Sequence, residues 1–232
     1  MTNRVKRAIK SLLRGNEGED YQGITFSQEG EDILIPFFLK NEERGIYVDV
    51  GAHHPFRFSN TALLYSQGWH GINIDPLPGV KELFDQHRPN DINLNCGIGP
   101  RRERLTYYMF EEPALNTFSA SQAAVRKQQG FHAVNEIPID TRPLGEVLEK
   151  YLVGKDVSLL TIDAMDYDYE VLRSNNWDLF KPKLIIVHDD SGDLKFNDVS
   201  AALHTRTCLF LKELKYSLVA KTYWSSFFLH NG

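Results

Sequence analysis

The amino-acid sequence predicts an α/β fold built on a doubly wound, mostly parallel sheet. Short apolar runs alternate with segments of helical pattern along most of the chain, which is typical of parallel strands joined by crossover helices. The first run, residues 46–50, ends at Gly51, and the second, residues 71–75, ends on Asp75. A glycine turn and an acid at the ends of neighbouring strands favour a small-molecule site at that edge of the sheet.

Composition and charge narrow the class of protein. The chain has 232 residues, of which 42% are hydrophobic and 25% charged, as is usual for one large globular domain or two small ones. The formal net charge of −5 argues against nucleic acid as a partner. Cys96 and Cys208 form neither a disulfide framework nor a zinc pattern, and no apolar run reaches the length of a membrane span, about 20 residues. We therefore expect a cytoplasmic protein.

The first 15 residues are basic and contain no acid. Their apolar side chains fall on one helical face, which allows two interpretations. The segment could lie on an anionic membrane surface as a peripheral contact, or it could be a solvated arm or a helix packed on the domain. Residues 15–23 are expected to form a linker. We therefore divide the chain into an arm and linker, residues 1–22, and one domain, residues 23–232.

Helices and strands are expected to alternate over the next part of the chain. Ser27 is the expected N-cap of a first helix, whose first turn carries acids, and Gly45 ends it. Ser59 caps a second helix that ends at Gly68. The expected elements are helix 26–44, strand 46–50, helix 59–67, strand 71–75, helix 80–87 and strand 91–98.

The regular pattern is interrupted by a long insertion after the third strand, at about residues 101–142. The segment holds a strand-like run, LTYYMF, a polar stretch and a second strand near residues 133–139. Long insertions in α/β folds often cover the active site, so a lid is one interpretation and a solvated β-hairpin is the other. The pattern then resumes with helix 143–151, strand 158–162, helix 167–174, strand 183–187, helix 198–214 and a closing antiparallel pair.

The type of cofactor follows from the turn after the first strand. A dinucleotide needs several glycines so that backbone amides can meet its pyrophosphate, whereas His53, His54 and Phe56 occupy that position here. S-adenosylmethionine has no phosphate, so one glycine suffices. Asp75 follows Gly51 at about the 20-residue spacing of a strand–helix–strand unit and could accept hydrogen bonds from a ribose. An ordinary buried strand and turn without a ligand is the alternative.

Several segments resemble the FkbM family of S-adenosylmethionine-dependent methyltransferases. The matching segments are FSQEGED at 26–32, YVDVGAHHPFRFSNT at 47–61, GINID at 71–75, INLNCGIG at 92–99, LLTIDAMDYDYEVLRSNNW at 159–177 and the closing KYSLVAKTYW. The resemblance implies a class I methyltransferase fold, Rossmann-like, with a doubly wound seven-stranded sheet whose last strand is antiparallel. It also implies O-methylation of a hydroxyl on a sugar, a glycan or a related natural product.

The resemblance also suggests roles for individual residues. Asp49 and Gly51 would lie by the amino-acid end of the cofactor, Asp75 at the ribose, and Asn95 and Cys96 near the adenine. The remaining residues expected at the cofactor are Ser59, Asn60, Gln28, Glu31 and His53.

One departure from the family pattern concerns catalysis. After the fourth-strand aspartate the family commonly reads Glu-Gly, whereas here Asp163 is followed by Ala164, Met165 and Asp166. Met165 therefore stands where the glutamate is expected, and a catalytic role for that glutamate does not carry over. Because this acid is missing, a second interpretation of the function stays open: a cofactor-binding partner protein without catalysis. An NAD-dependent oxidoreductase would share the fold, but this sequence lacks the glycine cluster that such an enzyme needs.

Two devices could remove the proton from an acceptor hydroxyl. Asp163, Asp189 and Asp190 follow adjacent expected strands, and such carboxylates suit Mg²⁺, which would lower the pKa of a bound hydroxyl. The alternative is a plain base, for which His188, His54, His53 and Asp163 are candidates. Aromatic residues of the insertion and the tail could stack on a sugar ring: Phe110, Phe118, Tyr223 and Trp224.

Overall fold

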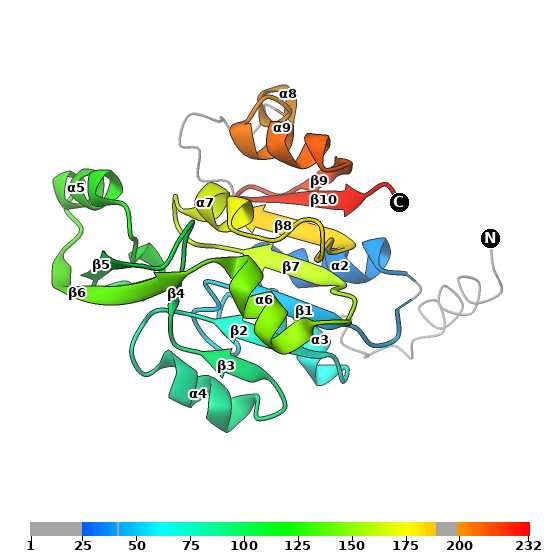
Figure 1. The fold of residues 1–232 in the computed structure, drawn as a ribbon. Coiled ribbons are helices and arrows are strands. Elements are labelled where there is room, and N and C mark those ends of the chain that lie inside the picture. Colours follow the sequence, from blue (N-terminus) through cyan, green and yellow to red (C-terminus); the bar gives the residue numbers. More distant parts are fainter. Residues whose placement is uncertain (1–24, 41, 189–198) are drawn as a thin grey trace, which may run out of the picture.

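A seven-stranded, mostly parallel sheet forms the centre of the molecule (Figure 1). The computed structural model describes residues 25–40, 42–188 and 199–232. Within them the strand order is β3-β2-β1-β7-β8-β10-β9, and the last strand, β10, runs antiparallel to both of its neighbours. The predicted mixed α/β class with a mostly parallel sheet is confirmed. The strands are β1 (Ile46–Val50), β2 (His70–Ile74), β3 (Ile92–Leu94), β7 (Leu159–Ile162), β8 (Leu184–His188), β9 (Tyr216–Lys221) and β10 (Ser225–His230).

Helices cover both faces of this sheet, which explains why its central strands read as continuous apolar runs. Alternate residues of β1 point to opposite faces. Val48 and Val50 pack with helices α6, α7 and α9, whereas Tyr47 packs with α2 and α3. The helices named here are α2 (Glu31–Phe38), α3 (Ala62–Ser66), α6 (Leu144–Leu152), α7 (Asp168–Arg173) and α9 (Arg206–Glu213), and α4 (Val80–His87) follows β2.

Two predicted helices differ from those observed. The first begins at Glu31 after its N-cap residue Gly30, rather than at Ser27, whose hydroxyl donates to the Asp32 carboxylate and accepts from Asp32 N from outside the helix. The predicted helix 198–214 is two helices, α8 (Val199–Ala202) and α9. Thr205 separates them, since its hydroxyl accepts a hydrogen bond from the Cys208 N–H and so caps α9.

The predicted third strand, residues 91–98, is also two elements. β3 ends at Leu94, and β4 (Gly97–Ile98) belongs to a separate sheet of order β4-β6-β5. The chain leaves the main sheet at Asn95, whose amide donates to the carbonyls of Asp75 and Leu77. β5 (Glu103–Phe110) and β6 (Ala133–Arg142) form the antiparallel pair of the insertion. Between them lie η1 (Pro113–Leu115) and helix α5 (Ala120–Gln128), which the sequence pattern did not predict.

Among the described residues, two ion pairs join the insertion to loops of the main sheet beside the cavity. Arg126 on α5 pairs with Asp166 at 3.1 Å, and their side chains are only 6% and 12% exposed. The Thr117 hydroxyl supports this contact by donating to the Met165 carbonyl at 2.9 Å. The second pair, Arg57 with Glu112 at 3.1 Å, is exposed. The insertion is therefore fixed firmly on its α5 side and weakly on its η1 side.

Membrane association was one interpretation of the first 15 residues. They and the expected linker lie outside the described residues. None of the described helices has the length and apolar character needed to cross a bilayer.

The buried ion pair predicts how the insertion responds to substitution. We expect Arg126→Gln to accelerate amide hydrogen exchange in both residues 111–131 and residues 163–168, because it breaks the buried ion pair between Arg126 and Asp166, a loss of about 3 kcal/mol or more.

Arg104→Gln is the matched control within the same insertion. It breaks an exposed pair with Asp140, 65% and 66% exposed, which contributes under about 1 kcal/mol, and exchange should change little. Unchanged exchange at residues 163–168 in Arg126→Gln would contradict the coupling.

Candidate active site

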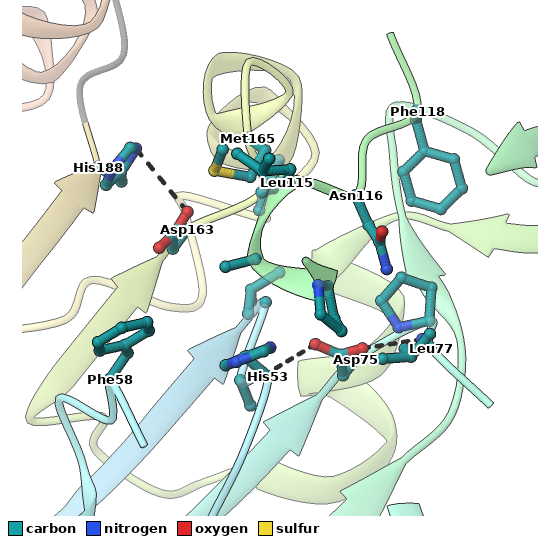
Figure 2. A pocket seen from close by; sticks show the side chains of 18 of the residues that line it. His53, Phe58, Asp75, Leu77, Leu115, Asn116, Phe118, Asp163, Met165 and His188 are labelled. Carbon is teal, nitrogen blue, oxygen red and sulfur yellow. Dashed lines mark hydrogen bonds and ion pairs between the residues drawn. The ribbon is translucent and has the colours of Figure 1, made fainter. Parts of the chain in front are cut away.

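A large cavity opens where the parallel strands end (Figure 2). Its volume of about 760 Å³ lies in the range of small-molecule sites. Residues after β1, β2, β3 and β7 form one side, and η1 and α5 of the insertion form the other. The position agrees with the rule that ligands of open α/β sheets bind beyond the carboxyl ends of the strands.

Gly51, directly after β1, is required by its surroundings. Its φ of 81° is one that side chains rarely adopt, and a Cβ atom on this residue would lie 1.8 Å from the Asp163 carbonyl oxygen. A glycine at the end of a strand can let a ligand approach the backbone closely. The backbone that approaches Gly51 is instead that of the β7 end, although Gly51 also lines the cavity.

Asp75 lies at the end of β2, and two backbone amides hold its carboxylate. Oδ2 accepts from His53 N and Oδ1 from Leu77 N, both at 2.8 Å. Burial raises the pKa of Asp75 to about 6, although both amides favour the ionised form. Each carboxylate oxygen keeps a second lone pair for a ligand. The side chain is thus fixed in orientation and still able to accept further hydrogen bonds.

Asp49 forms part of the cavity wall from within β1. Its Oδ2 accepts a hydrogen bond from the Thr61 hydroxyl at 2.6 Å. Burial raises the pKa of Asp49 to about 6, against the opposing effects of the Thr61 hydrogen bond and the positive charge of Arg88. At neutral pH the carboxyl is therefore mainly ionised.

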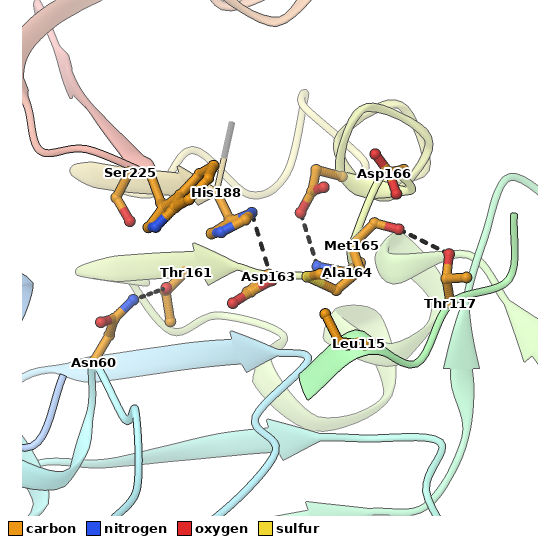
Figure 3. A network of polar contacts seen from close by, with 12 residues as sticks. Asn60, Leu115, Thr117, Thr161, Asp163, Ala164, Met165, Asp166, His188 and Ser225 are labelled. Carbon is orange, nitrogen blue, oxygen red and sulfur yellow. Dashed lines mark hydrogen bonds and ion pairs between the residues drawn. The ribbon is translucent and has the colours of Figure 1, made fainter. Parts of the chain in front are cut away.

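Asp163 and His188 lie together at the ends of β7 and β8 (Figure 3). Their Oδ1 and Nδ1 atoms are 3.8 Å apart, and the side chains are 43% and 11% exposed. The His188 ring stacks on Trp224, with 5.9 Å between ring centroids. Asp163 N donates to Val50 O at 2.9 Å, so the carboxylate is held at the cavity edge beside a histidine.

The turn after Asp163 is strained. Met165 and Asp166 both have positive φ values, 46° and 72°, which cost non-glycine residues about 1 kcal/mol or more each. The Asp168 carboxylate supports the turn by accepting from Ala164 N at 2.8 Å. Burial raises the pKa of Asp168 to about 7, and the charge of Asp163 adds to the effect.

The insertion supplies residues that sequence reasoning missed. Asn116, 5% exposed, lines the cavity. Its Oδ1 accepts from Phe110 N, while its Nδ2 has no hydrogen-bond partner within the described part of the chain. Tyr107 lies in the same wall, and its ring packs against Phe118 at 4.8 Å. This wall offers an unused donor beside aromatic rings, which suits a flat heterocycle. In the sequence Asn116 is a single asparagine in a polar stretch, so no local pattern marked it as a cavity residue.

Most of the chain matches the model of one protein family. The model of the Methyltransferase FkbM domain matches residues 49–218, which includes the end of β1, most of the cavity lining and the insertion. The chain belongs to the FkbM methyltransferase family. No curated protein gives a significant match to it.

Many of the residues expected at the site line the cavity of this FkbM-family protein. Four expected residues do not, because their side chains have other partners. The Glu31 carboxylate accepts from the Ser225 hydroxyl and Glu29 N, and His54 Nδ1 accepts from two backbone amides of its own turn. Ser59 bonds to Arg88, and Asn95 holds the loop after β2. The expected residues that do line the cavity are Gln28, Asp49, Gly51, His53, Asn60, Asp75, Cys96, Asp163 and His188.

The expected aromatic and metal-binding residues are only partly brought together. Phe118 and Trp224 line the cavity, whereas Phe110 is buried away from it and Tyr223 is exposed outside its lining. Of the three expected Mg²⁺ ligands, Asp163 is described, while 189–190 lie outside the described residues. Among described residues, no cluster of three His, Cys, Asp or Glu side chains could hold a metal ion.

Substitution of Gly51 tests the contact between the ends of β1 and β7. We expect Gly51→Ala to cost about 2 kcal/mol or more, through backbone strain and the clash with Asp163, which lowers the melting temperature by about 4–8 °C. Gly154→Ala is the control, because Gly154 also has a positive φ, 73°, but open space around its Cβ position. Equal losses in the two variants would show that the clash contributes nothing.

The pH dependence of stability tests the burial of Asp168. Its pKa of about 7 in the folded state exceeds its ordinary value of 3.8, so the folded state binds an extra proton between these values and loses stability as the pH rises. Asp168→Asn keeps an acceptor for Ala164 N but does not titrate.

Urea unfolding should therefore show Asp168→Asn gaining stability relative to the unchanged protein from pH 5 to pH 8, by about 1 kcal/mol or more. A difference that stays constant across this range would contradict the elevated pKa.

Proposed function

We propose that this FkbM-family methyltransferase uses S-adenosylmethionine to methylate a hydroxyl group of a sugar, a glycan or a related natural-product acceptor. The charge of the cavity carries the proposal. Its described wall includes three carboxylates, from Asp49, Asp75 and Asp163. Arg126 is the one lysine or arginine in that wall, and Asp166 balances its charge. Such a cavity favours a cationic cofactor and disfavours the pyrophosphate of a dinucleotide.

The proposed cofactor fits the cavity at several points. Asp75 would accept hydrogen bonds from the ribose, Asp49 would lie at the methionine end, and Asn116 with Phe118 would hold the adenine. The unused Asn116 donor supports this assignment, because a ring nitrogen could accept its hydrogen bond. When bound, S-adenosylmethionine supplies a methyl group on a positively charged sulfur.

The chain's own contribution to the reaction is to position the acceptor and remove its proton. A sugar hydroxyl is a weak nucleophile at neutral pH and needs a base. Asp163 and His188 are the proposed pair, because they adjoin at the cavity edge. This pair would take the proton of the acceptor hydroxyl as its oxygen receives the methyl group, and the bond from the methyl carbon to the sulfur would break to leave neutral S-adenosylhomocysteine. The ring of Trp224, stacked on His188, would offer a face for a sugar. His54 has no part in this proposal, since it does not line the cavity.

The negative charge of the cavity also limits which chemical class of acceptor can bind. Three carboxylates disfavour a phosphorylated or carboxylated acceptor close to the reacting hydroxyl. A neutral acceptor is therefore proposed. Mg²⁺ assistance by Asp163, Asp189 and Asp190 stays a prediction, and the proton transfer proposed here uses only Asp163 and His188.

A second candidate is a cofactor-binding partner protein without catalysis. The observation that favours it is Met165, which stands in the cavity wall where the family commonly has glutamate. Turnover with any hydroxyl acceptor would exclude this candidate. An NAD-dependent oxidoreductase is disfavoured by the charge of the cavity.

Calorimetric titration with S-adenosylhomocysteine tests the proposal. We expect micromolar binding by the unchanged protein, and binding at least about tenfold weaker in Asp75→Ala, because hydrogen bonds to a charged group contribute about 1.5–3 kcal/mol each. Asp140→Ala, which removes an exposed acid of the insertion, is the control and should bind normally.

The titration is repeated with and without Mg²⁺, which tests the metal prediction separately. Absence of binding under both conditions would overturn the proposed function.

A further inference from the structure

Arg88 is the largest fully buried side chain near the cavity, with 0% exposure. It follows helix α4 as its C-cap residue and does not line the cavity. Its guanidinium contacts neutral groups: the hydroxyls of Ser59 and Thr61, both at 2.8 Å, and the Pro55 carbonyl. A buried positive charge is costly unless a negative charge balances it. The negative charges that balance Arg88 must therefore act through intermediate residues.

Asp49 is one of these countercharges. Arg88 Nη1 donates to Thr61 Oγ1, and the same hydroxyl donates its only proton to Asp49 Oδ2 at 2.6 Å. Because a hydroxyl has one proton, accepting from Arg88 directs that proton toward Asp49. The three groups form a relay that ends on the cavity wall.

The second countercharge is Asp91, which is already well satisfied. It accepts from Tyr47, from Gly71 N and from Asn73 Nδ2, and Asn73 Oδ1 lies 3.5 Å from Arg88 Nη1. Asp91 is thus structural, whereas Asp49 also faces the cavity. Of the two acids, only Asp49 can transmit the effect of Arg88 to a ligand.

Arg88 also fixes the loop between β1 and α3. Its contacts with Pro55, Ser59 and Thr61 span this loop, which carries the cavity residues Phe58 and Asn60. Phe58 has a positive φ of 58°, so the loop is held in a conformation that it would not adopt freely.

We propose that Arg88 is a positioning residue for the cofactor end of the cavity, acting through Thr61 to keep Asp49 oriented and ionised without touching the ligand. The effect of Arg88 on ligand binding rests on the proposed function, whereas its effect on Asp49 does not. The other charged groups acting on Asp49 are Asp163 and Asp75, both of which disfavour its ionisation. Arg88 is therefore the charge that opposes them.

The experiment compares Thr61→Val and Arg88→Met with the unchanged protein. Thr61→Val keeps the branched shape of the side chain and removes the hydroxyl of the relay. Arg88→Met removes the charge, and if it fails to fold, Thr61→Val alone decides. Ser59→Ala is the matched control: it removes a contact of the same guanidinium and leaves the Arg88–Thr61–Asp49 hydrogen bonds in place, since Ser59 meets this relay only at the side, through a 3.4 Å contact with the Thr61 hydroxyl.

The first measurement is the carboxyl titration of Asp49 by NMR. Burial raises its pKa to about 6 in the unchanged protein, and the relay variants lose groups that favour ionisation. We expect the midpoint to rise by about one unit or more in Thr61→Val and Arg88→Met and to stay in place in Ser59→Ala. An unmoved midpoint in folded Thr61→Val would overturn the proposal.

The second measurement is the affinity for S-adenosylmethionine as a function of pH. A one-unit rise lowers the ionised fraction of Asp49 at pH 6 from about one half to about one tenth, so binding in Thr61→Val should be about fivefold weaker at pH 6 and nearly equal at pH 8.5. A loss that is the same at both pH values would indicate a purely structural role and overturn the proposal.

The two measurements separate this inference from the proposed function. Failure of the unchanged protein to bind either S-adenosylmethionine or S-adenosylhomocysteine would overturn the proposed function. The NMR midpoints would still decide whether Arg88 acts on Asp49.

Discussion

The contact between the Asp163 carbonyl and Gly51 determines where the rest of the site can lie. A side chain at residue 51 would occupy the position of that carbonyl, so the glycine lets the ends of β1 and β7 meet. Asp163 N in turn donates to Val50 O. Because these two strand ends are fixed against each other, the carboxylates of Asp49 and Asp163 face one cavity, with Asp75 beside them.

Three neighbouring carboxylates repel one another, and hydrogen bonds from neutral groups offset part of this repulsion. Thr61 binds Asp49, and backbone amides bind Asp75. Arg88, acting through Thr61, opposes only one of these charges, so the cavity remains acidic while Asp49 and Asp75 are each held in one orientation. A cationic ligand could supply the missing countercharge, and we regard this as the main physical reason why the site suits the proposed cofactor.

The sequence predicted the parts of the fold that depend on local pattern. Apolar runs identified the strands of the main sheet, and Gly51 and Asp75 marked the cavity edge. The division of residues 91–98 into β3 and β4 was not predictable, because it depends on hydrogen bonds from Asn95 to a distant loop. Helix α5 has few apolar residues, so its pattern is weak. Asn116 was missed because its importance arises only when the insertion folds over the strands.

The two described ion pairs that join the insertion to loops of the main sheet beside the cavity should respond differently to salt. Dissolved ions screen interactions between exposed charges over a Debye length that falls from about 10 Å at 0.1 M ionic strength to about 3 Å at 1 M, and they screen buried pairs far less. Arg57 and Glu112 are exposed, 43% and 46%, whereas Arg126 and Asp166 are nearly enclosed. Rising ionic strength would therefore loosen the edge of the cavity near η1 while α5 stays attached, so the ionic medium itself would influence access to the cavity.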